Sequence, residues 1–209
     1  MNRLPFALKT LKSVVAGVLL LLVAGGLAQA SESPVQVVQS LNNTLLATMK
    51  DARRLGFDGR YKLLAPVLRG SFNYPLMAEV VAGGYWERLT ADERTELVKA
   101  FTEMSIATFA ARFDGYSGEQ FVADGEKPAL RGAVLVKNKL VEHSGKAVPI
   151  DYLLRRFPDG WRIIDVFLDA NYSELAIKRS EYSSILERQG FNGLMKAIKA
   201  KIAQLQAGT

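Results

Sequence analysis

Cysteine is absent from the 209 residues, and histidine occurs only at His143. Without cysteine the chain can form no disulfide and offers zinc no thiolate ligand. His143 lies in a polar segment, His143-Ser144-Gly145-Lys146, so we interpret it as a surface residue and exclude a histidine-rich metal site. No phosphate loop or dinucleotide fingerprint is present. We therefore expect no metal and no cofactor, and a fold stabilised by an ordinary hydrophobic core.

The first thirty residues are typical of a secretory signal. Three basic residues precede an apolar run at positions 14–27, which ends at Ala28-Gln29-Ala30. The run is shorter than the roughly 20 residues that span a bilayer. We predict cleavage after Ala30, export to the periplasm, and a single domain over residues 31–209. An uncleaved anchor is the alternative.

The charge of the chain is only mildly basic once this leader is removed. Residues 31–209 hold 24 basic and 21 acidic residues, too small an excess to predict a nucleic-acid partner. Basic pairs recur at Arg53-Arg54, Arg155-Arg156 and Lys178-Arg179. We interpret most of them as solvated surface, with docking on anionic head groups or on an acidic partner as the alternative.

The first half of the mature chain has the periodicity of helices. Ser33-Pro34 can cap a helix with apolar residues three and four apart, and Thr90-Ala91-Asp92-Glu93 is a capping box. The patterns predict a helix from Pro34 to near Gly56, two short helices around residues 61–68 and 73–82, and a long helix from Thr90 to about Phe113.

After Gly115 the apolar residues alternate, which indicates strands. Four are expected, at 120–123, 129–141, 148–157 and 160–169, followed by two helices at 172–187 and 191–206 that Gly190 separates. This order predicts an α+β fold in which helices pack on a curved antiparallel sheet of about four strands.

Two carboxylates in the predicted sheet suggest an enzyme as an alternative. Asp165 lies among apolar residues, where burial would raise its pKa, and it or Asp151 could act as a general base in a small-pocket NTF2-like enzyme. The structural alternative is a salt bridge to Arg155, Arg156 or Arg162.

Three stretches in the same order resemble the MlaC family of periplasmic lipid-binding proteins, which are auxiliary components of an ABC transport system. They are Gly84–Phe101 (GYWERLTADERTELVKAF), Val148–Phe167 with VPIDYLLRR and GWRIIDVF, and Arg179–Leu194 with RSEYSSIL and GFNGL. The segment Ala111–Phe121 (ARFDGYSGEQF) is most similar to the HpnM branch, which is associated with hopanoids. The resemblance implies a pocket for lipid tails between sheet and helices, and no catalysis.

We therefore predict a monomeric, non-enzymatic periplasmic carrier that moves a phospholipid or hopanoid between an inner-membrane transporter complex and an outer-membrane partner. A non-catalytic adaptor of a membrane complex is a further alternative. From the apolar pattern, we predict that the lipid pocket is lined by Leu64, Leu68, Phe72, Met77, Val80, Phe101, Tyr152, Leu154, Ile163 and Phe167.

Overall fold

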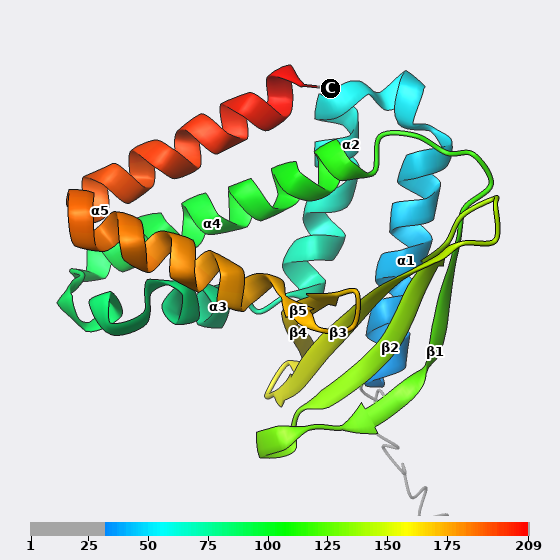
Figure 1. Ribbon diagram of the computed structural model, residues 1–209, viewed down its shortest axis with the longest axis horizontal. Helices are drawn as coiled ribbons and strands as arrows, with labels where there is room; N and C mark the ends of the chain where they lie inside the picture. Colours follow the sequence, from blue (N-terminus) through cyan, green and yellow to red (C-terminus); the bar gives the residue numbers. More distant parts are fainter. Residues whose placement is uncertain (1–31, 209) are drawn as a thin grey trace, which may run out of the picture. The chain divides into compact units, whose positions relative to one another are not determined.

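The computed structural model describes residues 32–208, so the predicted signal peptide lies outside the described residues. Within this part, helices precede and follow a single sheet (Figure 1). The elements are α1 (Pro34–Lys50), α2 (Ala52–Ser71), α3 (Tyr74–Ala82), η1 (Gly83–Arg88), α4 (Ala91–Arg112), β1 (Gln120–Pro128), η2 (Leu130–Gly132), β2 (Val134–Val141), β3 (Ala147–Phe157), β4 (Gly160–Leu168), β5 (Tyr172–Ser173) and α5 (Glu174–Ala207).

The five strands form one antiparallel meander in the order β1-β2-β3-β4-β5. Register shifts at Ala123/Glu126 and at Leu153/Leu154 interrupt the ladders, and such bulges increase the local twist of a sheet. The expected α+β fold on a curved antiparallel sheet is confirmed. The fifth strand, β5, was not predicted because it is only two residues long, and it pairs with Phe167 and Leu168 at the end of β4.

Helix α1 packs against β1, β2 and β4 along the sheet (Figure 1). It begins as predicted at Ser33, whose hydroxyl accepts a hydrogen bond from the Gln36 amide while the Gln36 side chain binds the Ser33 amide. Its inward face includes Val38, Leu41 and Leu45, all fully buried. The spacing of three and four residues thus becomes a single apolar stripe against the sheet.

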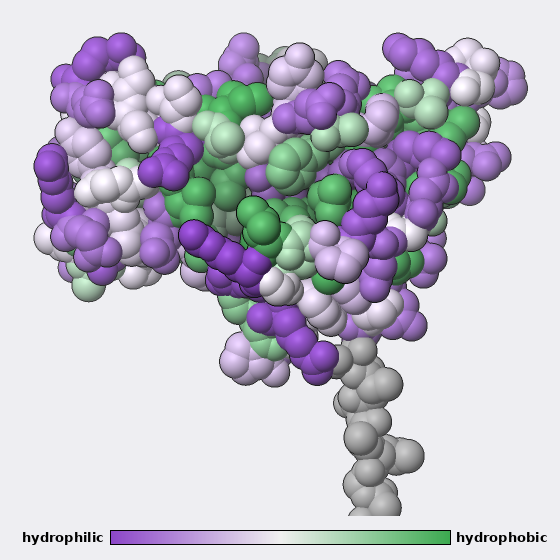
Figure 2. Space-filling model, turned by 60° about the horizontal axis from the view of Figure 1, so that its bottom comes forward, coloured by the Kyte–Doolittle hydropathy of each residue, from purple (hydrophilic) through white to green (hydrophobic). Residues whose placement is uncertain are grey.

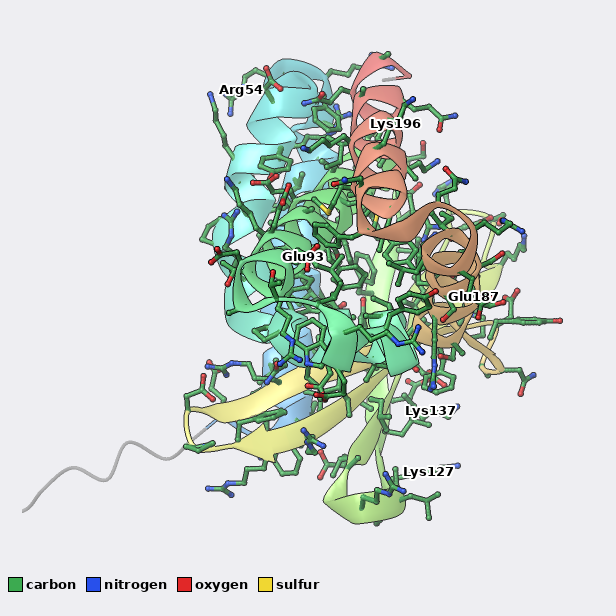
Figure 3. All side chains as sticks on the ribbon, turned by 90° about the vertical axis from the view of Figure 1, so that its left-hand side faces the viewer. Arg54, Glu93, Lys127, Lys137, Glu187 and Lys196 are labelled. Carbon is green, nitrogen blue, oxygen red and sulfur yellow. The ribbon has the colours of Figure 1, made fainter. Side chains whose placement is uncertain are left out.

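The predicted capping box of α4 is also confirmed. Thr90 accepts a hydrogen bond from the Glu93 amide, and the Glu93 carboxylate accepts one from the Thr90 amide. Figure 3 shows Glu93 at the start of this helix. Helix α4 has buried residues on more than one side, because it contacts α2, α3 and α5.

Two of the expected boundaries were wrong. The first helix ends at Lys50, and α2 runs from Ala52 through Gly56, where φ is +58° and the helix kinks without ending. Pro66 lies inside α2. Likewise, residues 129–133 do not belong to the second strand: the bulge carries β1 on to Pro128, and Arg131 and Gly132, both with positive φ, make the turn into β2.

The last helical segment bends at Gly190, as the sequence predicts, where φ is +66° and ψ is −170°. Its first half contacts α3 and its length packs along α4. Within residues 32–208, none of the helices combines the length and the apolar character needed to cross a membrane. Figure 2 shows the face that lies at the bottom of Figure 1. On this face, apolar side chains gather around a hollow, and hydrophilic side chains surround the apolar group.

Candidate functional site

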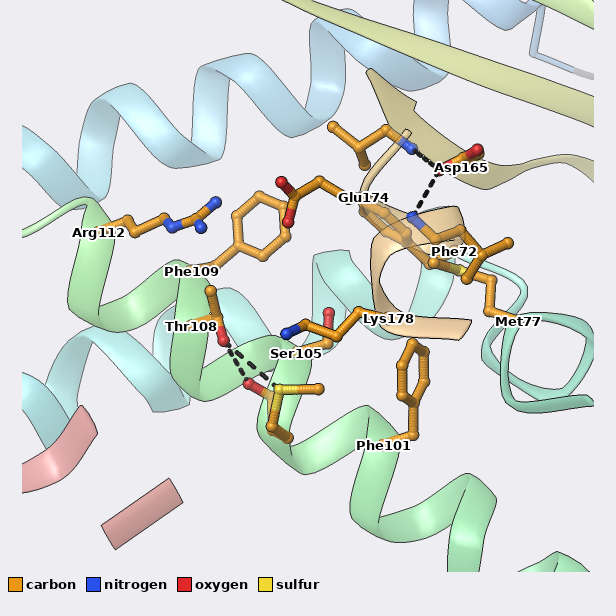
Figure 4. A pocket seen from close by; sticks show the side chains of 13 residues that line it. Phe72, Met77, Phe101, Ser105, Thr108, Phe109, Arg112, Asp165, Glu174 and Lys178 are labelled. Atoms are coloured by element: carbon orange, nitrogen blue, oxygen red, sulfur yellow. Dashed lines mark hydrogen bonds between the residues drawn. The ribbon is translucent and has the colours of Figure 1, made fainter. Parts of the chain in front are cut away.

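An apolar cavity lies between α4, the beginning of α5 and strand β4 (Figure 4). The space open to the centres of water molecules is about 100 Å³. Its apolar walls are Phe72, Met77, Phe101, Met104, Phe109, Val166 and Leu175, and its polar lining is Ser105, Thr108, Arg112, Asp165, Glu174 and Lys178. Helices that precede the sheet in the sequence and the helix that follows it therefore build one site together with β4.

Aromatic rings form much of the cavity wall. Phe72 stacks on Tyr74 with ring centroids 5.5 Å apart, and its ring meets Phe109 edge to face at 5.8 Å. Phe101 meets Tyr182 of α5 edge to face at 6.3 Å. Phe72 is held beside β4 because the next residue, Asn73, donates its amide to the carbonyl of Ile163 at 2.9 Å. The wall is thus fixed to the sheet at one end.

Charged groups lie at one side of the cavity. In Figure 4 the ends of Arg112, Glu174 and Lys178 point toward the region around the Phe109 ring. Lys178 also pairs with Glu181, with its Nζ 2.6 Å from Oε2. Deeper in the site, Ser105 donates to the Tyr74 hydroxyl at 3.2 Å, and burial raises the pKa of Tyr74, so that its phenol stays neutral. The cavity therefore joins an apolar interior to a charged rim, which suits an amphipathic ligand.

Asp165 is positioned as a cap for α5 rather than as a free base. Its carboxylate accepts hydrogen bonds from the Ser173 hydroxyl at 2.6 Å, the Leu175 amide at 3.1 Å and the Val166 amide at 2.7 Å. Burial raises the pKa of Asp165, while these three donors oppose the rise. The structural alternative of a salt bridge to an arginine was wrong for Asp165: hydroxyl and amide groups bind this carboxylate, and Arg162 pairs with Asp159.

Asp151 is buried on β3 and is not among the residues that line the cavity. It forms an ion pair with Lys137 of the neighbouring strand and accepts a hydrogen bond from the Asn138 amide at 3.0 Å. Lys137, visible in Figure 3, was not among the partners expected for it. Across residues 32–208, no cluster of three or more His, Asp and Glu side chains is placed to hold a metal ion.

The ten predicted pocket residues separate into three groups. Phe72, Met77 and Phe101 line the cavity. Val80 and Phe167 are half-buried outside its lining. The remaining residues are buried in the surrounding core, namely Leu64, Leu68, Tyr152, Leu154 and Ile163. Whether any of them contacts a lipid stays a prediction.

Sequence reasoning missed four apolar lining residues, Met104, Phe109, Val166 and Leu175. Met104 and Phe109 belong to the long helix α4, which has buried residues on more than one side, so the side that faces a cavity depends on where α5 packs. Leu175 follows the break between β5 and α5, and no periodic pattern marks it.

The cavity is small for a lipid tail. Ligand pockets usually have about 300–1,000 Å³, so a ligand of that size requires the walls to separate. Two features allow this movement. Met77 and Met104 have flexible side chains that repack readily, and Gly190 divides α5 into two segments that can move relative to each other.

Comparison with known proteins gives one family and one fold. A search of curated proteins found no match. Among solved structures, the chain is similar to a phospholipid-binding protein from Ralstonia solanacearum, determined in complex with a phospholipid. The TM-score is 0.71 at 19% identity, covering 81% of this chain and 96% of the other, which shows a shared fold. The family profile described as "MlaC protein" matches residues 39–200, and the chain therefore belongs to the MlaC family.

Proposed function

We propose that this protein is a non-enzymatic periplasmic carrier, which holds a lipid in the cavity between α4 and α5 and moves it between the inner and outer membranes. The observation that supports this most is the cavity itself, with aromatic and methionine walls and a charged rim. Membership of the MlaC family and the fold shared with a phospholipid-binding protein support it further. The partners would be an inner-membrane transporter complex and an outer-membrane protein, with the carrier acting as a monomer.

The energetics of a carrier favour a pocket of this kind. Each buried methylene is worth about 0.8 kcal/mol, so a lipid with tens of carbons does not dissolve freely in water. Moving a tail from bilayer to cavity exchanges one apolar surrounding for another, and the net change stays small. Separating the walls to admit a whole tail costs free energy, and this weakens binding enough for release.

The charged rim favours a phospholipid over a hopanoid as cargo. Arg112 and Lys178 can bind a phosphate, while Glu174 can bind an amine on the same head group. A neutral triterpenoid would leave these three groups without ligand contacts. HpnM-like hopanoid binding stays the alternative, which the identity of the bound lipid decides.

A cavity-filling substitution tests the proposal. Thr108 and Thr95 lie on the same helix, and each hydroxyl donates to the carbonyl four residues before it at 2.9 Å. Thr108 lines the cavity, whereas Thr95 is exposed outside its lining. We expect Thr108→Phe to lose most of the lipid that copurifies with the exported protein, as measured by solvent extraction and mass spectrometry, and Thr95→Phe to keep it.

Two results would count against this function. If the folded wild-type protein carries no lipid and takes up none from vesicles, the carrier model is wrong. If both phenylalanine variants keep the same amount of lipid, the protein binds lipid somewhere other than this cavity.

A further inference from the structure

Two hairpins of the sheet lie at the same end of its strands. The β1–β2 and β3–β4 turns share this end because β2 pairs with β3 in antiparallel register, with Val134 opposite Leu154, although the twist of the sheet splays the two hairpins apart (Figure 3). We call residues 126–131 and 155–162 the basic sheet end. Neither segment lines the cavity between α4 and α5.

The net charge of the mature chain resides in this small region. The basic sheet end contains five basic residues, Lys127, Arg131, Arg155, Arg156 and Arg162, and two acidic ones, Glu126 and Asp159. Its excess of three positive charges equals the excess of the whole of residues 31–209, which have 24 basic and 21 acidic residues. The formal charges of the other parts of that chain therefore sum to zero, and the basic sheet end contributes the net positive charge.

An apolar side chain projects between Lys127 and Arg131 on the first hairpin. Leu130, at the tip of the β1–β2 hairpin, is 88% exposed, more than any other large hydrophobic residue that the structure describes. The next residue, Arg131, has a φ of +56°, which is uncommon for a residue other than glycine. Lys127 lies on the other arm of the hairpin, and Figure 3 shows it near the tip. A role in the hydrophobic core therefore does not account for a leucine at position 130.

The second hairpin adds aromatic groups to the same end. The guanidinium of Arg155 lies 4.7 Å from the centre of the Phe157 ring, and Trp161, the second residue of β4, is half-buried. Arg162 is paired with Asp159 at 3.0 Å. A projecting leucine on one hairpin and aromatic and basic side chains on the other are the residue types that bind the interface of a bilayer.

We propose that the basic sheet end docks on an anionic lipid bilayer, with Leu130 inserted below the head groups and with Lys127 and Arg131 bound to lipid phosphates. A bilayer fits better than a protein partner because the hairpin tip is a projection with one exposed apolar residue. Stable protein interfaces bury about 800 Å² on each partner around a packed centre. The head-group region of a bilayer, in contrast, can accept a single inserted side chain. Each basic residue near an anionic surface contributes about 1 kcal/mol, equivalent to about fivefold in affinity.

The absence of cysteine allows a direct test. In the exported protein, Leu130→Cys carries an environment-sensitive fluorophore. Tyr116→Cys is the matched control, on a residue that is 42% exposed and precedes β1, far along the strand from the hairpin tip. With vesicles of phosphatidylglycerol and phosphatidylethanolamine we expect the fluorophore at position 130 to shift to the blue and to brighten. The fluorophore at position 116 stays unchanged, and phosphatidylcholine vesicles give little response at either site.

Charge neutralisation gives a second readout. We expect Lys127→Gln with Arg131→Gln to weaken binding to the anionic vesicles by about 25-fold, from about fivefold for each charge. Lys196→Gln with Lys201→Gln removes the same charge from the C-terminal half of α5 and should change the affinity little. Figure 3 shows Lys196 at the opposite end of the molecule from Lys127.

Three outcomes would overturn the docking proposal. In the first, the fluorophore at position 130 shows no spectral change on anionic vesicles. In the second, both double variants weaken binding equally. In the third, the fluorophore responds to an acidic protein and not to lipid. Because these residues lie outside the cavity, lipid copurified with the double variants reports on the proposed function separately. Loss of docking with retained cargo, or retained docking without cargo, tells the two proposals apart.

Discussion

The side of the molecule where α1 meets the sheet differs from the side where α4 meets α5. On the α1 side, Val38, Leu41 and Leu45 are fully buried against the strands. On the α4–α5 side, methionine and phenylalanine side chains surround free space. The comparison indicates that side chains fill the space between α1 and the sheet. Room for a ligand is found between α4 and α5.

A buried polar network strengthens this difference. Asn42 of α1 donates its side-chain amide to the Asn138 side chain at 2.8 Å, and the Asn138 amide donates to Asp151, which pairs with Lys137. The network is only partly satisfied, because the buried Asn42 Oδ1 and Asn138 Nδ2 atoms have no hydrogen-bond partner among the described residues. The bond between the two asparagines still ties α1 to β2 at one register. On the cavity side, aromatic rings form much of the wall, and the polar contacts of Asp165 and Ser105 lie at its margins.

The largest expected effect compares core truncation on the two sides. Leu41→Ala leaves a hole in a fully packed region, and we expect the free energy of unfolding to fall by about 4 kcal/mol. Met77→Ala enlarges a cavity that already exists, and we expect a loss of about 2 kcal/mol. Urea unfolding of both variants measures the difference. Equal losses would mean that the two sides are packed equally well.

A medium effect concerns the kink in α5. Gly190 has φ +66° and ψ −170°, a region that only glycine enters readily, so Gly190→Ala should cost about 1–3 kcal/mol of stability. An added Cβ there would meet no atom within 4 Å, so strain in the backbone is the cause. Gly70→Ala in α2 is the control, because its Cβ also meets nothing and its backbone is ordinary; it should stabilise by about 0.4–1 kcal/mol. If the melting temperatures of both variants shift in the same direction, the prediction of backbone strain at Gly190 is wrong.

The smallest effect concerns Asp165 at the edge of the cavity. Because burial raises its pKa above 3.8, the folded state binds more protons than the unfolded state between the two pKa values. Its contribution to the free energy of unfolding therefore falls as the pH rises from about 3.8 through the folded pKa. We expect Asp165→Asn to remove this fall in a series of urea unfolding curves, while Asp58→Asn, on an exposed residue, keeps it. A curve for Asp165→Asn that runs parallel to wild type would show that another group is responsible.

Some structural features could be predicted because they depend on neighbouring residues alone. Ser33 and Thr90 cap helices through contacts within three positions, and Gly190 bends α5 through its own backbone angles. The turn between β1 and β2 was misplaced because its position follows from a bulge, which is a relation between two strands. Periodic patterns contain no record of such a shift.

Local sequence determined the class of fold, the caps and the apolar character of the helices in this protein. Tertiary structure alone decided which apolar residues surround free space: Phe72 and Met104 line the cavity, while Leu68 and Ile163 pack solidly beside it. All four satisfy the same hydrophobic pattern, because burial removes a side chain from water in either place. What differs is whether a second element fills the volume beyond it, and that depends on the path of α5 across α4.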